Sequence, residues 1–355
     1  MRYIIVGCGA AGLSAAKEIR DSDAKNEVVL ISDEVNPFYI RPAICDFLSG
    51  ELKEDDLFFK SESVSEGITV ISGKKVLKVL PDENAVVLSD GKKEKYNFLL
   101  LATGGKQKFP QKLLVHREKV FTLKTFADAY RLKERVQNAL RILVFGGGYI
   151  GVELLRALKR QEVEIIYLSK SGLFWPSGLT DISEKEVEKK LRDEGISVFP
   201  DEGINDIIDS NGKEYLVFTD EGKEIKCQFI GVALGLEPDT DFLTGSGIKC
   251  DKGILVSEEL RTNIANIYAA GDVAQVYDIN KKINRINFGW HSASVQGKTA
   301  GQNMAGGNVV YISDEDKFFH KLLFLLLKLF IVAFEHEEGK PIYNTPLLET
   351  LLRDR

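Results

Sequence analysis

Two sets of three glycines have the spacing of a loop that binds phosphate. They are Gly7, Gly9 and Gly12, and then Gly146, Gly148 and Gly151. In such a G-x-G-x-x-G loop the first glycine makes a tight turn, the second lets the backbone approach a pyrophosphate, and the third lets a helix pack closely on a strand. The N-terminus of that helix favours negative charge. The chemistry that these residues offer is dinucleotide binding, at two places in the chain.

Each loop needs a strand before it and a helix after it, and the sequence predicts both. Residues 2–6 and 141–145 are short apolar runs that predict buried strands, whereas residues 13–19 and 149–155 predict helices. A single glycine motif is weak support for a nucleotide site. Two motifs, each in the required context, predict two such sites.

The second strand of each unit should end beside the adenosine ribose of its nucleotide. Residues 27–31 predict this strand in the first unit, and Asp33 and Glu34 follow it. We expect Glu34 to accept the ribose hydroxyls, with Asp33 as the alternative, although either could be a solvated loop acid. In the second unit Lys170 stands where an acid is expected. A cation there can accept the phosphate of NADP, so NADH and NADPH both remain open, as does a Lys170 that points to solvent.

Three further stretches are expected beside a ligand of the first unit. Ala102, Thr103 and Gly104 follow a buried apolar strand, and their small size allows close approach. Gly271 and Asp272 follow another strand, where a carboxylate would lie at the ligand edge of the sheet. A helix predicted over residues 292–305 could direct its N-terminus at an anion. From the residues alone, the segment 37–51 is a cover over a cofactor or a surface loop.

Composition and charge narrow the function further. The 355 residues carry a net charge of −6, which argues against nucleic acid as a partner. The four cysteines, Cys8, Cys45, Cys227 and Cys250, form no C-x-x-C pair. This pattern excludes a zinc ribbon, so no metal is expected, and it fits a reducing compartment. Since Met1 leads straight into the first predicted strand, we see no signal peptide and expect a cytoplasmic protein.

The apolar stretch of residues 318–334 contains His320, Lys321 and Lys328. A membrane span needs about twenty apolar residues, so this stretch is too short and too charged for one. A buried strand pair, a core helix and an oligomer interface are competing interpretations. A membrane-surface anchor is a minor alternative, and a homodimer is compatible with the interface interpretation.

With these motifs in order, residues 1 to about 305 resemble the FAD-dependent pyridine nucleotide-disulfide oxidoreductases. The resemblance implies that FAD is bound by one set of residues: Gly7, Gly9, Ala10, Ala11, Gly12, Asp33, Glu34, Arg41, Pro42, Ala102, Thr103, Gly104, Gly271, Asp272 and Trp290. It implies that NADH or NADPH is bound by a second set: Gly146, Gly148, Tyr149, Ile150, Gly151, Glu153 and Lys170. Tyr149 matches the family tyrosine that covers the nicotinamide pocket until the nucleotide enters.

The segments around Arg41–Pro42 and Trp290 look like the branch of rubredoxin reductases, ferredoxin reductases and nitrite reductase flavin domains. The C-x(4)-C pair of glutathione-reductase-like members is missing. The single redox cysteine of the family's oxidases and peroxidases would fall at Pro42, so Cys45 is out of register. We expect Cys45 to be a buried apolar residue, with redox activity as a minor alternative, and Cys8 to be structural.

The predicted fold is α/β, with two Rossmann-like three-layer nucleotide-binding domains and a short C-terminal extension. Residues 1–107 and 237–305 would bind FAD. Residues 108–236, inserted between them, would bind NAD(P)H, and residues 306–355 would form a truncated interface segment.

The predicted activity is that of an FAD-dependent NAD(P)H oxidoreductase. Hydride would pass from nicotinamide to flavin, and electrons would then leave directly, without a redox disulfide, for a small carrier such as rubredoxin or for a small molecule. No protein acid or base is required, because the redox chemistry belongs to the cofactor. The alternatives are a membrane-surface NADH:quinone reductase, an NADH oxidase and a flavoprotein that binds nucleotide to report redox state to a partner.

Overall fold

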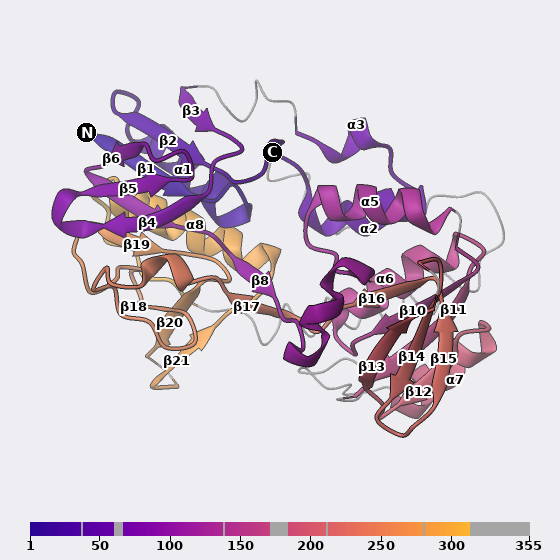
Figure 1. The fold of residues 1–355 in the computed structure, drawn as a ribbon. Coiled ribbons are helices and arrows are strands. Elements are labelled where there is room, and N and C mark those ends of the chain that lie inside the picture. The colour runs from indigo at the N-terminus through magenta and orange to yellow at the C-terminus, as the bar shows by residue number, and fades with distance from the viewer. Residues whose placement is uncertain are drawn as a thin grey trace. The chain divides into compact units, whose positions relative to one another are not determined.

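The computed structural model describes residues 1–36, 38–59, 67–137, 139–170, 184–210, 212–279 and 281–312. The chain divides into two units, each built around a parallel sheet (Figure 1). The first contains Met1–Pro42, Glu54–Lys108 and the described residues from Gly235 onward. The second contains Ala43–Lys53 and Phe109–Leu234.

The first unit is organised around a five-stranded parallel sheet in the order β19-β7-β1-β2-β3. Its strands are β1 (Arg2–Val6), β2 (Glu27–Ile31), β3 (Ile68–Ile71), β7 (Phe98–Leu101) and β19 (Ile267–Ala269). The central strands β1, β2 and β7 are continuous apolar runs and are almost fully buried, as expected for a sheet covered on both faces.

Two helices of the first unit, α1 (Ala10–Ser22) and α8 (Trp290–Met304), pack backbone against backbone. A Cβ added at Gly297 of α8 would lie 2.1 Å from the carbonyl oxygen of Ala11. Small residues on α8 therefore allow this close crossing, and they bring the start of α8 beside the first glycine loop.

The remaining elements of the first unit form small sheets and short helices. They are η1 (Arg41–Ala43), α3 (Glu54–Leu57), β4 (Val76–Leu80), η2 (Pro81–Glu83), β5 (Ala85–Leu88), β6 (Lys93–Lys95), β8 (Gly105–Gln107), β17 (Leu236–Pro238), η4 (Asp241–Leu243), β18 (Ile254–Val256), β20 (Ala274–Asp278) and β21 (Ile283–Ile286). Strands β4, β5 and β6 pair as an antiparallel meander, and β17 pairs antiparallel with β8.

The second unit repeats the parallel arrangement, in the order β12-β11-β10-β16-β9. The strands are β9 (Val120–Phe121), β10 (Arg141–Phe145), β11 (Glu164–Ser169), β12 (Ser197–Pro200) and β16 (Phe229–Val232). An antiparallel sheet of β13 (Ile204–Asp209), β14 (Tyr215–Thr219) and β15 (Glu224–Cys227) follows β12. The helices are α2 (Ile44–Ser49), η3 (Gln111–Lys119), α5 (Phe126–Val136), α6 (Tyr149–Lys159) and α7 (Glu184–Asp193).

The predicted α/β class with two Rossmann-like domains is confirmed. The units divide between Lys108 and Phe109 and between Leu234 and Gly235, and residues 43–53 group with the second unit. Which unit binds FAD stays a prediction at this point. The apolar stretch 318–334 lies outside the described residues, as does most of the predicted segment 306–355. In the described part of the chain, no helix has both the length and the apolar character that a bilayer crossing needs.

Candidate nucleotide-binding sites

The first glycine loop connects β1 to α1, and its three glycines have different surroundings. Gly7 has φ +112°, and a Cβ added there would lie 2.1 Å from the carbonyl oxygen of Ala102. A Cβ on Gly12 would lie 1.9 Å from the carbonyl oxygen of Gly7, whereas one on Gly9 would meet nothing within 4 Å. The protein's own backbone therefore requires glycine at the first and third positions, and the second position faces open space.

That open space lies at the N-terminus of α1. Gly9 is the N-cap, no side chain caps the helix there, and the first turn contains no acidic residue. The first N–H groups of a helix lack intrahelical partners, and the dipole adds positive charge. The loop therefore fits the pyrophosphate of a dinucleotide such as FAD, with Ala10 and Ala11 in the first turn too small to obstruct it.

The second glycine loop connects β10 to α6 and repeats this construction. Gly146 has φ +133°, and a Cβ there would lie 2.2 Å from the carbonyl oxygen of Ala233. A Cβ on Gly151 would lie 2.2 Å from the carbonyl oxygen of Gly146. Helix α6 begins at Tyr149, after the N-cap Gly148, again without a side-chain cap. The side chain of Tyr149 lies outside the described part of the structure, so its role over a nicotinamide pocket stays a prediction.

Both loops lie against an Ala-x-Gly segment that follows a buried strand. Ala102 precedes Thr103 and Gly104 at the end of β7, and Ala233 precedes Leu234 and Gly235 at the end of β16. The sequence predicts a ligand contact for the first segment. The second has the same Ala-x-Gly pattern after a buried strand, and that pattern would have predicted its place beside the second loop. In both cases the alanine carbonyl fills the space where a side chain on the first loop glycine would lie.

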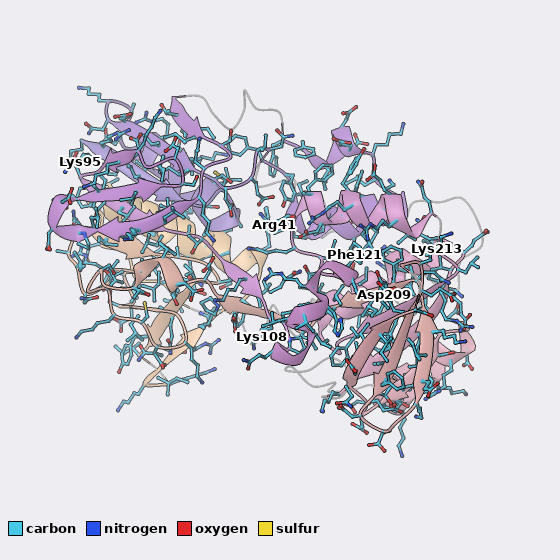
Figure 2. The ribbon with its side chains drawn as sticks, viewed as in Figure 1. Arg41, Lys95, Lys108, Phe121, Asp209 and Lys213 are labelled. Atoms are coloured by element: carbon cyan, nitrogen blue, oxygen red, sulfur yellow. The ribbon has the colours of Figure 1, made fainter. Side chains whose placement is uncertain are left out.

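Glu34 lies just beyond the end of β2, where the sequence predicts a ribose contact, and two neighbours fix its carboxylate. Arg41 donates to Oε1 over 2.6 Å, and the hydroxyl of Tyr39 donates to Oε2 over 2.8 Å (Figure 2 labels Arg41). The backbone N–H of Glu34 donates to Ser32 Oγ over 3.1 Å. Asp33 is exposed. The structure thus favours Glu34 over Asp33 as the oriented acid, and it places Arg41 on that acid.

The Gly271–Asp272 segment is fixed by contacts with α8 and the residue before it. Gly271 donates its N–H to Gln296 Oε1 over 2.9 Å, and Asp272 Oδ1 accepts the N–H of Gly289 over 3.1 Å. Gly289 is the N-cap of α8, and no side chain caps that helix. Trp290, the first residue of α8, packs partly buried against the core. The predicted strand-end carboxylate and helix N-terminus therefore lie together.

A chain of buried hydrogen bonds continues from Gln296 to a tyrosine beyond α8. Gln296 Nε2 donates to Ser292 Oγ over 3.1 Å, and Ser292 Oγ is 2.9 Å from the Tyr311 hydroxyl. Asn287 Nδ2 donates to the same hydroxyl over 3.1 Å. Sequence reasoning missed Tyr311, because a single tyrosine after a helix carries no pattern that points to a partner. Its hydroxyl links the end of the described chain to the Gly271 segment.

The predicted nicotinamide-site residue Glu153 lies in a buried ion cluster of the second unit. Arg156 Nη2 donates to Glu153 Oε2 over 3.0 Å and also binds Asp46. Arg156 Nη1 donates to Glu51 Oε2 over 3.1 Å. Burial raises the pKa of Glu153, and the Arg156 charge opposes that shift. The cluster ties α2 to α6, and a contact of Glu153 with nicotinamide stays a prediction.

Lys170, directly after β11, is paired with a carboxylate that sequence reasoning did not identify. Its ammonium group donates to Asp220 Oδ2, although 59% of the lysine side chain is exposed. Asp220 lies in the turn between β14 and β15, fifty residues further along the chain. The pattern around Lys170 could not reveal this partner, because only the fold brings the turn to the end of β11.

The four cysteines all lie in described parts of the chain, and all are unpaired. Burial raises the pKa of the Cys8 thiol to about 12 and that of Cys227 to about 12. Burial also holds the pKa of Cys45 well above its usual value. These thiols stay protonated at neutral pH, which agrees with structural roles for Cys8 and Cys45. Among the described residues, no group of three or more His, Cys, Asp or Glu is placed to hold a metal ion.

Comparison with known proteins gives a consistent group of relatives. Residues 1–297 match the family model described as pyridine nucleotide-disulphide oxidoreductase. The chain is 30% identical over 319 residues to an NADH-rubredoxin oxidoreductase of Clostridium acetobutylicum, covering 87% of this chain and 76% of that protein. It is also 30% identical over 319 residues to an NADH oxidase of Methanocaldococcus jannaschii, covering 86% and 70%.

A solved structure shares the same fold. The NAD-dependent persulfide reductase from A. fulgidus matches with a TM-score of 0.81 and 25% identity, over 88% of this chain and 60% of that one. All three relatives are longer than the region they share with this chain.

Proposed function

The chain belongs to the pyridine nucleotide-disulphide oxidoreductase family, and we propose that it passes electrons from NADH or NADPH, through FAD, directly to a small electron-carrier protein such as a rubredoxin. It is an FAD-dependent NAD(P)H oxidoreductase. Two further points are proposed: that electrons leave the flavin without passing through a disulfide, and that a small carrier protein accepts them.

The route without a disulfide rests on the cysteines. The chain has four, and in the structure none is paired. Cys8, Cys45 and Cys227 are buried, with thiol pKa values raised by burial. A redox cysteine works as an accessible thiolate, and these three lack both properties. Cys250 is exposed, but a redox disulfide needs a second accessible cysteine, and the other three are buried. This is the observation that carries the proposal, because electrons would then leave the cofactor itself.

The residues of the first unit fit an FAD cofactor. The open space beside Gly9 and the uncapped start of α1 suit its pyrophosphate, and Glu34 is oriented where the adenosine ribose would lie. Asp272 and the uncapped start of α8 lie at the carboxyl end of β19, and we assign them to the rest of the cofactor. When bound, FAD would supply the redox chemistry, since a flavin can accept hydride and release electrons.

The second unit has the same loop and is assigned to NADH or NADPH. Its uncapped helix α6 would bind the pyrophosphate, and the residue after β11 would meet the adenosine ribose. The work of this chain's residues is to bind and orient two nucleotides. No protein acid or base is assigned.

The proposed acceptor follows from one relative, the NADH-rubredoxin oxidoreductase of Clostridium acetobutylicum. A second candidate activity, NADH oxidase, is favoured by the Methanocaldococcus jannaschii relative. The two differ in whether oxygen competes with a carrier protein for the electrons. A cytoplasmic location is part of the proposal, since unpaired cysteines suit a reducing compartment. A homodimer stays a prediction.

Stopped-flow reoxidation distinguishes these acceptors. The enzyme is reduced anaerobically with one equivalent of NADH and mixed with oxidised rubredoxin, with a quinone or with oxygenated buffer, while flavin absorbance is followed. The proposal expects reoxidation by rubredoxin at least tenfold faster than by oxygen. Faster reoxidation by oxygen would favour the oxidase, and fastest reoxidation by the quinone would contradict both.

A further inference from the structure

The turn between β14 and β15 lies against the ends of β11 and β12. Asp220, in that turn, donates its backbone N–H to the carbonyl oxygen of Gly203, just after β12, over 2.9 Å. The turn is closed by hydrogen bonds between Thr219 and Lys223, with the N–H of Lys223 also donating to Thr219 Oγ1 over 3.1 Å. The position of the Asp220 backbone is therefore set by bonds that its side chain does not make.

The side chain of Asp220 binds Lys170 across a glycine. A Cβ added at Gly203 would lie 2.8 Å from Asp220 Oδ2 and 2.9 Å from Lys170 Cδ. Any side chain there would push the two groups apart. The absence of a side chain at Gly203 thus permits this ion pair at the end of β11.

A second ion pair lies beside the first. Lys223 binds Glu202 Oε1, and only 5% of the Glu202 side chain is exposed. The other carboxylate oxygen of Glu202 has no hydrogen-bond partner among the described residues. The four groups carry two positive and two negative charges, so each ammonium group is already engaged by a carboxylate.

These two ion pairs lie where the adenosine ribose of a bound dinucleotide is expected. In a dinucleotide-binding unit the adenosine ribose lies beyond the second strand, which here is β11, next to the glycine loop after β10. NADH has a neutral 2′-hydroxyl there, whereas NADPH has a phosphate that carries a charge of about −1.5 to −2 at neutral pH. A phosphate would have to displace Asp220 from Lys170 while remaining close to that carboxylate.

We propose that Asp220 is a specificity-determining residue, which selects NADH over NADPH by holding Lys170 in an ion pair. This inference rests on the proposed function, because it requires the second unit to bind a nicotinamide dinucleotide. Lys170 standing in place of an acid would by itself suit NADPH. Asp220 reverses that preference, because its carboxylate balances the positive charge of Lys170 and lies near the 2′ position, where it would repel a phosphate.

The direct test measures binding of two nucleotide fragments by calorimetry. ADP carries a 2′-hydroxyl and 2′,5′-ADP carries a 2′-phosphate, and neither can reduce flavin. The wild-type protein should bind ADP more tightly. D220N frees Lys170 and removes a charge that repels phosphate, so affinity for 2′,5′-ADP relative to ADP should rise about tenfold or more, as for one charge-assisted hydrogen bond gained.

Three control variants isolate the ion pair. E221Q removes the same charge from the next residue of the turn, which is exposed, and should leave the ratio within about twofold. D220E retains the carboxylate and should keep the preference for ADP. The double variant K170A/D220N removes the freed cation and should lose most of the gain in 2′,5′-ADP binding.

The same ratio is then measured as kcat/KM for NADPH over NADH, with a dye as acceptor. Circular dichroism and thermal melting confirm that each variant is folded. A wild-type protein that prefers 2′,5′-ADP, or a folded D220N variant whose ratio is unchanged, would overturn the inference while leaving the proposed function intact. A wild-type protein that binds neither fragment would overturn both.

Discussion

The two glycine loops use the same backbone arrangement and differ in what lies at the end of the neighbouring strand. In both, the first glycine contacts an alanine carbonyl and the third contacts the carbonyl of the first. Beyond β2, however, the acid Glu34 is bound by Arg41 and Tyr39 from the next few residues. Beyond β11, the cation Lys170 is bound by Asp220 from a distant turn. Backbone packing thus fixes the geometry that the two loops share, and the side chains at the strand ends are where the two units differ.

The largest expected effects come from breaking one loop at a time. In G12A the new Cβ would collide with the Gly7 carbonyl, and in G151A with the Gly146 carbonyl. We expect G12A to be purified with less than about a tenth of the wild-type FAD, given a clash costing about 1–3 kcal/mol. G151A should keep its FAD but lose NADH affinity. Flavin absorbance and NADH titration measure these losses, and a G12A protein with full FAD content would contradict the assignment of the first unit.

The buried cluster of the second unit provides a sharp test of stability. R156M removes the cation that binds Asp46, Glu51 and Glu153, and so leaves the buried carboxylates of Asp46 and Glu153 without that partner. Breaking such a cluster should cost about 3–5 kcal/mol of unfolding free energy, measured by urea denaturation. K93M, at an exposed ion pair of the first unit with Glu83, is the control and should cost less than about 1 kcal/mol. Equal costs for the two variants would contradict the burial argument.

The hydrogen-bond chain that ends at Tyr311 is expected to have a smaller effect. Y311F removes the hydroxyl that bonds Ser292 and Asn287, and should cost about 1–3 kcal/mol because buried polar groups lose their partner. Since these hydrogen bonds also orient Gln296 on Gly271, FAD should bind several-fold more weakly to Y311F. Y277F, which removes the hydroxyl of an exposed tyrosine, is the matched control. An unchanged FAD dissociation constant in Y311F would show that these hydrogen bonds stabilise the fold without affecting FAD binding.

The smallest expected effect concerns thiol reactivity. Burial raises the pKa values of Cys8, Cys45 and Cys227, so their thiolate form is populated only at higher pH. Cys250 is exposed, and burial of part of its side chain raises its pKa less strongly. At pH 8 an aromatic disulfide reagent should modify Cys250 alone, and the C250S variant should not react. A fast-reacting Cys45 would reopen a redox role for that residue.

The sequence predicted the parts of the sites that depend on local pattern. The glycine spacing with its flanking apolar strand and helix predicted the strand–loop–helix arrangement of both loops. The acid after β2 was predicted from its fixed position in such a unit, and its contact with ribose stays a prediction. The sequence did not reveal the roles of Asp220, Arg156 and Tyr311. Their partners Lys170, Asp46 and Ser292 lie 50, 110 and 19 residues away in the chain, and no periodic pattern links the members of each pair. Only the folded backbone brings those groups together.

The most direct test of the central claim, that the two loops bind two different nucleotides, is an anaerobic titration of the purified protein with NADH. The account predicts one FAD for each chain, and flavin absorbance near 450 nm that falls linearly until about one equivalent of NADH has been added. G151A should hold the same FAD and need a large excess of NADH. A colourless wild-type protein that takes up no FAD, or a flavin that neither NADH nor NADPH bleaches, would contradict the account.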